Sequence, residues 1–106
     1  MTVVEIDAGS CGFKTQIRVS KTDARMVRIS ISSDCEAVKK WGGQLGSLNW
    51  RECIGKNAFS SPTFISATEC FKHPACPVYI GMLKAIEVEI GASLPVNATI
   101  RFLPEA

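Results

Sequence analysis

The sequence predicts a single α+β domain over residues 1–106, in which helices pack on one face of a sheet of about four strands. Three observations lead to this fold class. Apolar and polar residues alternate with period two in the first third of the chain, helical spacing follows, and alternation returns after Pro95. The predicted order is βββ-α-α-α-β, a two-layer sandwich with a mixed sheet. With 106 residues and 46% of them hydrophobic, the chain is large enough for one core and too apolar to be disordered.

Three strands are predicted in the first third, because apolar residues occupy every second position there. These residues are Val4 and Ile6, then Ile17 and Val19, then Val27, Ile29 and Ile31. A turn at residues 21–25 joins the second and third strands into a hairpin. The Gly-rich segment 8–12 connects the first strand to the second.

Helical spacing begins where the third strand ends. Ser33 and Glu36 form an S-x-x-E capping box, in which the serine hydroxyl accepts a hydrogen bond from the glutamate amide. The apolar positions of the first helix are Val38, Trp41, Leu45 and Leu48. A second helix opens at Ser61 and Pro62 and must stop before Pro74. Its apolar stripe is Phe64, Ala67 and Phe71.

The last helix has the clearest boundaries. Cys76 is its predicted N-cap, Pro77 its first residue, and Gly91 lies just past its end. Its main apolar face consists of Tyr79, Met82, Leu83, Ile86 and Ile90. Residues 96–102 then alternate and are predicted to form the fourth strand, whereas residues 47–60 show no clear pattern.

Charge and hydropathy exclude several classes of protein. The 12 basic and 10 acidic side chains give a net charge of +2, too balanced to indicate binding to nucleic acid or membrane. Lys14, Arg18 and Arg28 on the polar strand faces lack the interleaved aromatic residues of a base-stacking sheet. No apolar stretch approaches about 18 residues, and no signal-peptide pattern is present. We therefore expect a cytoplasmic protein that binds neither nucleic acid nor membrane.

No familiar catalytic motif is present. The chain contains no P-loop, no G-x-G-x-x-G, no H-E-x-x-H and no G-x-S-x-G. A single histidine, His73, cannot supply a His-rich metal site. An ordinary hydrolase is thus disfavoured, and no enzyme class is predicted.

Five cysteines are many for an intracellular chain of this length. Their odd number, without a secretory segment, disfavours a disulfide framework. Cys11 follows the first predicted strand and Cys35 the third, so both leave the same end of the sheet. Cys76 joins them if the fourth strand runs parallel to the third, because the crossover then starts the last helix at that end. Cys35 and Cys76 also lie at predicted helix N-termini, where the helix dipole lowers the pKa of a thiol.

Four short segments around these cysteines and the last helix carry a resemblance. They are Asp7-Ala8-Gly9-Ser10-Cys11-Gly12-Phe13, Ser33-Asp34-Cys35-Glu36, His73-Pro74-Ala75-Cys76-Pro77-Val78 and Leu83-Lys84-Ala85-Ile86-Glu87-Val88. The chain resembles, over nearly its whole length, an uncharacterised family of small proteins from anaerobic prokaryotes. The resemblance implies a set of three cysteines, Cys11, Cys35 and Cys76, with Cys53 and Cys70 outside the family's pattern. A looser resemblance to the TSCPD domain rests on the Cys-Pro start of the late helix. The family has no established activity, so the resemblance implies the positions of the three cysteines and not a function.

Three functions are compatible with these positions. In the first, Cys11, Cys35 and Cys76 bind zinc or an iron–sulfur cluster. The fourth ligand is then His73, Cys70, water or a side chain of a partner protein. In the second, Cys76 is the attacking thiolate of a sulfur-transfer or redox protein, with His73 as its base. In the third, the cysteines are buried apolar residues of a structural or protein-interaction module.

The last helix also predicts association. Ile80 and Val88 lie outside its main apolar face, and Gly81 between them permits close approach of another backbone. A two-layer domain covers only one broad side of this helix, so we expect a homodimer that buries the other side. The alternative is a monomer in which the middle segment covers that side, through Trp50, Ile54 and Phe59.

Overall fold

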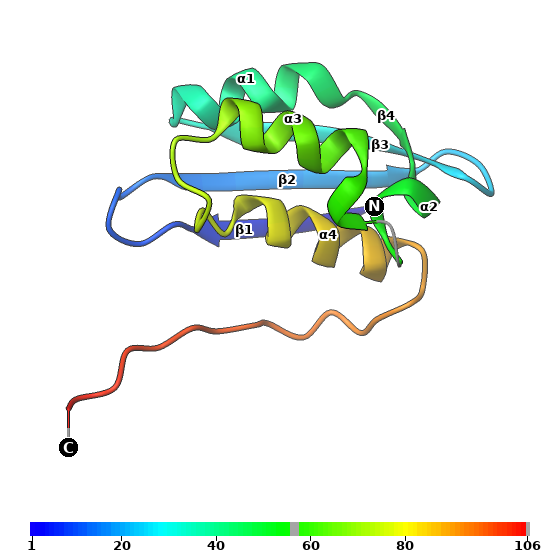
Figure 1. Ribbon diagram of the computed structural model, residues 1–106. Coiled ribbons are helices and arrows are strands. Elements are labelled where there is room, and N and C mark those ends of the chain that lie inside the picture. The colour runs from blue at the N-terminus through cyan, green and yellow to red at the C-terminus, as the bar shows by residue number, and fades with distance from the viewer. Residues whose placement is uncertain (56–57, 106) are drawn as a thin grey trace.

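The computed structural model describes residues 1–55 and 58–105 and contains a four-stranded sheet with helices on one face (Figure 1). The strands are β1 (Thr2–Asp7), β2 (Lys14–Lys21), β3 (Met26–Ser33) and β4 (Ser47–Asn49), which lie side by side in that order. The helices are α1 (Glu36–Leu45), α2 (Trp50–Cys53), the 3₁₀ helix η1 (Ala58–Ser60), α3 (Pro62–Cys70) and α4 (Val78–Glu89). The predicted α+β class is confirmed.

The three long strands form as their alternation predicts. β1 pairs antiparallel with β2, and β2 with β3. Their inward residues Ile6, Ile17, Val19, Val27 and Ile29 are buried beneath the helices, while the polar residues of the other face are exposed. The side chain of Asp23 closes the β2–β3 hairpin by accepting hydrogen bonds from the amides of Arg25 (2.8 Å) and Met26 (2.9 Å). These bonds lower the pKa of Asp23.

The fourth strand differs from the prediction. Residues 96–102 are exposed and pair with no strand in the described parts of the chain, whereas β4 follows α1 and pairs antiparallel with β3. The predicted mixed sheet and the order βββ-α-α-α-β were therefore wrong. Leu48, expected on the first helix, lies in β4, because the helix ends at Gly46 with a φ of 63°. Alternation shows only that one face of a segment is apolar. It does not show which edge the segment pairs with.

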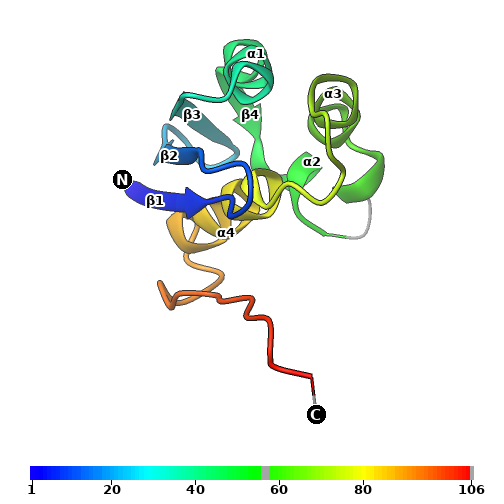
Figure 2. The same cartoon turned by 90° about the vertical axis from the view of Figure 1, so that its left-hand side faces the viewer.

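The helices form more than one layer (Figure 2). α1 packs on β3, α4 packs on β1 and β2, and α3 packs against α1. Trp41 joins these helices: its ring meets those of Phe71 and Tyr79 at centroid distances of 5.0 and 5.8 Å. The predicted two-layer sandwich is therefore not confirmed.

Two helix starts show how local bonding sets element boundaries. Ser61 caps α3 as predicted, since its hydroxyl oxygen accepts a hydrogen bond from the amide of Phe64 (3.1 Å). The predicted capping box at α1 is wrong. Ser33 still belongs to β3, and its hydroxyl oxygen accepts hydrogen bonds from the Thr15 hydroxyl (2.8 Å) and the Cys35 amide (3.2 Å). The N-cap of α1 is consequently Cys35.

Contacts in its first and last turns set α4 antiparallel to β1. Gly81 lies against Ile6 near the end of β1, where a Cβ atom would be 2.7 Å from Ile6 Cδ1 and closer still to Cγ1. At the other end, the Glu89 carboxylate accepts hydrogen bonds from the Thr2 hydroxyl (2.7 Å) and the Lys21 amide (2.8 Å). The close approach at Gly81 therefore serves the chain's own β1 and not a second copy.

We expect Glu89→Gln to lower the free energy of unfolding by about 1 kcal/mol at neutral pH, because a charged acceptor forms stronger hydrogen bonds than a neutral one. The Lys21 amide and then the Thr2 hydroxyl hold the pKa of Glu89 below its ordinary value of 4.5. A carboxyl whose pKa is lowered by folding stabilises the fold above that ordinary value, and the contribution is lost as the pH falls through the folded pKa.

Urea unfolding at neutral and acid pH checks this expectation. The difference between wild type and Glu89→Gln should shrink as the pH falls below the ordinary pKa of glutamate. Glu87→Gln in the same turn is the matched control and should change stability little. A difference that is equally large at both pH values would contradict the role given to the Glu89 charge.

In the described ranges, none of the helices has the length and apolarity that spanning a bilayer requires.

Candidate functional site

Three cysteines lie at one end of the sheet. Cys11 is in the loop between β1 and β2, Cys35 follows β3, and Cys76 precedes α4. The antiparallel pairing brings the ends of β1 and β3 to the start of β2, and α4 starts at that end because it runs antiparallel to β1 (Figure 1). The convergence expected from a parallel fourth strand therefore arises from another cause, the direction of α4.

Cys76 is half-buried and lies just before the N-terminus of α4. The helix begins at Val78 with Pro77 as N-cap, one residue later than predicted, and no side chain caps it. Burial is the largest influence on the Cys76 thiol and raises its pKa, while the nearby Val78 backbone amide acts in the opposite direction. The thiols of Cys35 and Cys11 raise the pKa further. Both are therefore within electrostatic reach of Cys76.

Cys35 occupies the N-cap of α1 and is also half-buried. Its amide donates to Ser33 Oγ (3.2 Å), and its carbonyl accepts the first helical hydrogen bond, from the Lys39 amide (2.9 Å). Its thiol caps no helix amide. The residue is thus held by backbone bonds at the positive end of a ten-residue helix.

Cys11 is exposed, in a loop bonded mainly to itself. The Ala8 amide donates to the carbonyl of Phe13 (3.2 Å), and the Gly12 amide donates to that of Gly9 (2.9 Å). Asp7 at the end of β1 accepts a hydrogen bond from the Gly9 amide (3.0 Å). These bonds shape the loop, and among the described residues no backbone hydrogen bond joins it to the helices.

The three thiols do not share a preformed coordination sphere. Within residues 1–55 and 58–105, no three His, Cys, Asp or Glu side chains are grouped closely enough to hold a metal ion. Of the two side chains considered as a fourth ligand, His73 is exposed, and Cys70 accepts a hydrogen bond from Gln44 Nε2 (3.5 Å). Cys53 is 1% exposed and lies 3.6 Å from the Thr63 hydroxyl, so it is a cysteine of the core.

An apolar hollow of about 210 Å³ adjoins Cys76 and was not predicted from the sequence. It is lined by Phe59, Phe64, Ala67, Thr68, Phe71, Pro74, Cys76, Tyr79 and Ile80. These residues come from η1, α3, α4 and the loop between the last two, so no single periodic segment indicates the hollow. Their apolar surface accounts for the desolvation of the Cys76 thiol.

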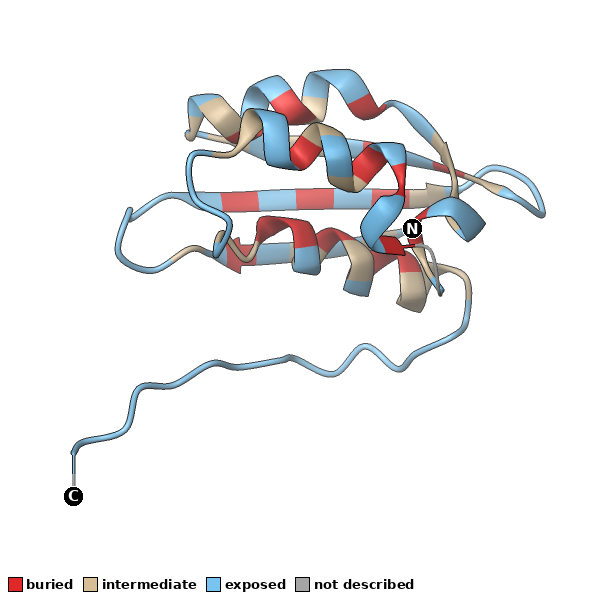
Figure 3. Ribbon diagram, in the orientation of Figure 1, coloured by how far each residue is buried: buried red, intermediate tan, exposed pale blue. Residues whose placement is uncertain are grey.

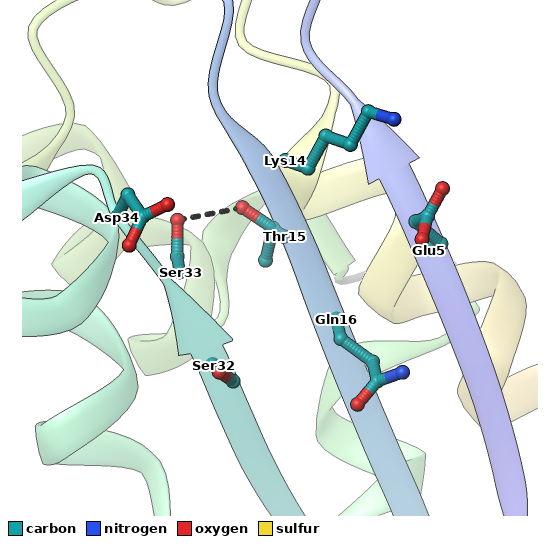
Figure 4. A pocket seen from close by; sticks show the side chains of 7 residues that line it. All are labelled: Glu5, Lys14, Thr15, Gln16, Ser32, Ser33 and Asp34. Atoms are coloured by element: carbon teal, nitrogen blue, oxygen red, sulfur yellow. Dashed lines mark hydrogen bonds between the residues drawn. The ribbon is translucent and has the colours of Figure 1, made fainter.

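A polar hollow of about 250 Å³ lies on the open face of the sheet at the same end (Figure 4). Its lining residues are Glu5, Lys14, Thr15, Gln16, Ser32, Ser33 and Asp34. The lining contains the negative charges of Glu5 and Asp34 and the positive charge of Lys14, so the electrostatic potential in the hollow is not of a single sign. The outward polar positions of β1 to β3 were the signal for this hollow in the sequence, although no hollow was predicted there.

A family model described as a family of unknown function (DUF6951) matches residues 2–102 of the chain. The matched range includes Cys11, Cys35 and Cys76. Searches of curated proteins and of solved structures found no match. The expectation of an uncharacterised family is thus confirmed. Because the match extends over far more than half of the sequence, the chain belongs to this family of unknown function, DUF6951.

Proposed function

We propose that Cys11, Cys35 and Cys76 form a thiolate site that binds a zinc ion or an iron–sulfur cluster. One observation carries the proposal: three segments far apart in the sequence bring their cysteines to one end of the sheet, within electrostatic reach of Cys76. Each ionised thiol disfavours the ionisation of its neighbours, so deprotonating all three costs free energy in the absence of a cation. A bound metal ion reverses that cost.

The chemistry of the donors supports a soft metal. Thiolates select zinc or the irons of a cluster, and three protein ligands leave one coordination position for water or a partner's side chain. Cys35 lies at the positive end of α1, and Cys76 lies two residues before the first residue of α4. Both helix ends favour the negative charge of a thiolate ligand.

The position of Cys11 shows which part of the protein must move when a metal binds. Its sulfur is exposed, whereas Cys35 and Cys76 are half-buried on the protein body. The Cys11 loop is closed by its own hydrogen bonds, so a movement towards the other two cysteines would break none of the backbone hydrogen bonds that the described helices make. Metal binding would draw this loop in and order it.

The thiol-chemistry alternative receives less support. An attacking thiolate needs a lowered pKa, but burial raises the pKa of Cys76. The ring of His73 is exposed, and the contact between these two residues is a backbone bond from the Cys76 amide to the His73 carbonyl (3.2 Å). Coordination to a cation deprotonates a thiol directly, so a metal site does not need a helping base.

Metal and sulfide analysis of protein prepared anaerobically, together with its visible absorption spectrum, tests the proposal. We expect either about one zinc per chain, or iron with sulfide and a coloured protein. Cys11→Ser, Cys35→Ser and Cys76→Ser should each lower the metal content sharply. Cys53→Ala is the control and should retain the metal, because Cys53 lies in the core.

Further variants examine the fourth position. If water or a partner completes the site, Cys70→Ser and His73→Ala should both retain the metal. If one of these two variants loses metal, the residue that it replaces is the fourth ligand. Colourless, metal-free protein from metal-replete anaerobic cells would contradict the proposal. Equal metal loss in Cys53→Ala and Cys76→Ser would contradict the assignment of ligands.

A further inference from the structure

The segment after α4 leaves large apolar side chains in water. Leu94, Val96, Ile100, Phe102 and Leu103 are between 74% and 96% exposed. Figure 3 shows the whole segment after α4 in the colour of exposed residues. We call residues 94–103 the arm. A contiguous set of exposed apolar residues of this size marks an interaction site in a folded protein.

The arm has the residue pattern of a half-buried strand. Val96, Ala98, Ile100 and Phe102 alternate with Asn97, Thr99 and Arg101. One face of the extended arm is therefore apolar and the other polar. A segment with this pattern forms backbone hydrogen bonds and buries its apolar side chains when it pairs with a sheet edge next to a core.

The end of α4 directs the arm away from its own sheet. The Gly91 amide donates to the Val88 carbonyl (3.1 Å), and the Ala92 amide donates to the Glu87 carbonyl (2.8 Å). With a φ of 82° at Gly91, these two bonds form a Schellman motif, which sets the direction in which the chain leaves the helix. In both views the arm then lies apart from the sheet and the helices (Figures 1 and 2).

β1 offers the matching edge. It lies at one end of the strand order, so its outer side has no strand partner among the described residues. The other edge strand, β4, has three residues, whereas β1 has six and the alternating part of the arm spans residues 96–102. A long open edge is a site of strand addition unless it is covered.

The side chains of β1 also fit those of the arm. Val4 and Ile6 of β1 face the helices, while Glu5 and Asp7 lie exposed on the open face. An added arm with its apolar face on the helix side would place Arg101 on the acidic open face. The added arm would also cover Val88, which is half-buried. Val88 lies seven residues after Gly81 and therefore on the same side of α4, the side beside β1.

We propose that the arm of one chain adds as a strand to the free edge of β1 in a second copy, and that two copies exchange arms reciprocally. A two-fold exchange buries both arms and leaves neither β1 edge open. The dimer expected from the sequence is thereby built on β1 and the arm, in place of the Ile80 side of α4. The inference is independent of the metal site, because the arm starts at the opposite end of α4 from Cys76.

Sedimentation velocity of the full chain at micromolar concentration is the first test. We expect a dimer, and half its mass for a chain truncated after Ser93. Ile100→Asp should dissociate the dimer as well, whereas Asn97→Lys places its charge on the polar face of the arm, towards the acidic open face of β1, and should leave the dimer intact. Far-UV circular dichroism shows that each variant is folded.

Hydrogen exchange supplies the second test. Amides of β1 that face the free edge should exchange much more slowly in the full-length dimer than in the truncated chain. A monomeric full chain would overturn the proposal, as would a dimer that survives truncation, or β1 exchange that truncation does not change. Dissociation by Ile80→Glu but not by Ile100→Asp would assign the interface to the other side of α4 and likewise overturn it.

Discussion

Trp41→Ala is expected to lower the free energy of unfolding by about 3–5 kcal/mol. Trp41 is 0% exposed, and its ring packs edge-on against Phe71 and beside Tyr79. Its indole N–H donates to the Thr63 carbonyl (3.3 Å) and to the Ser66 hydroxyl (3.2 Å). Truncation opens a cavity where α1, α3 and α4 meet and removes the donor of both bonds. Since a domain of this size has a stability of about 5–15 kcal/mol, the loss is a large share of the total.

Trp50→Ala is the matched control. Trp50 is half-buried and donates to the exposed carbonyl of Ala24 (3.1 Å), at the margin of the sheet. Its loss should therefore cost less than half as much as that of Trp41. Urea unfolding followed by far-UV circular dichroism gives both values without relying on tryptophan fluorescence. Equal losses for the two variants would show that Trp41 does not hold the helices together.

Gly81→Ala is expected to destabilise the protein by about 1–3 kcal/mol, although alanine is the better helix former. The added Cβ would overlap Ile6 Cγ1 and lie 2.7 Å from Ile6 Cδ1. The side chain of Ile6 is 9% exposed and is enclosed between the sheet and α4, so it has little room to move. The overlap forces α4 away from β1 or Ile6 out of its preferred rotamer.

Two comparisons isolate this clash. Gly43→Ala adds the same atom inside α1, where nothing lies within 4 Å, and should stabilise the protein by about 0.5–1 kcal/mol. Gly81→Ala combined with Ile6→Ala should cost clearly less than the sum of the two single variants, because the shortened side chain removes the overlap. A Gly81→Ala variant as stable as wild type, or a strictly additive double variant, would contradict the close packing of α4 on β1.

Much of the local structure could be predicted from the sequence. Alternation in β1 to β3 identified the buried residues of the sheet, such as Ile17 and Val19, because the period of a strand is a local property. The end of α4 at Gly91 followed from the preference of glycine for the left-handed conformation. The starts of α1 and α4 were each predicted less well. Ser33 bonds across the sheet to Thr15, and such a bond leaves no local signal.

The sequence predicted that Cys11 and Cys35 leave the same end of the sheet, but it did not predict why Cys76 joins them. The resemblance placed Cys11, Cys35 and Cys76 in one set, and the structure brings all three to one end of the sheet. The apolar hollow beside Cys76 had no signal in the sequence, since its walls come from separate elements. Whether thiols gather closely depends on how far each loop extends from the body, which residue types do not determine.

The sequence by itself determined the α+β class, the three long strands, the apolar sides of α1 and α4, and the chain's membership of its family. The tertiary structure alone decided that β4 and not residues 96–102 completes the sheet, and that α4 runs antiparallel to β1 with Gly81 against Ile6. The physical reason is the same in both cases. A periodic pattern shows that one face of a segment must be buried, but the partner that buries it is selected by steric fit and open edges across the whole fold.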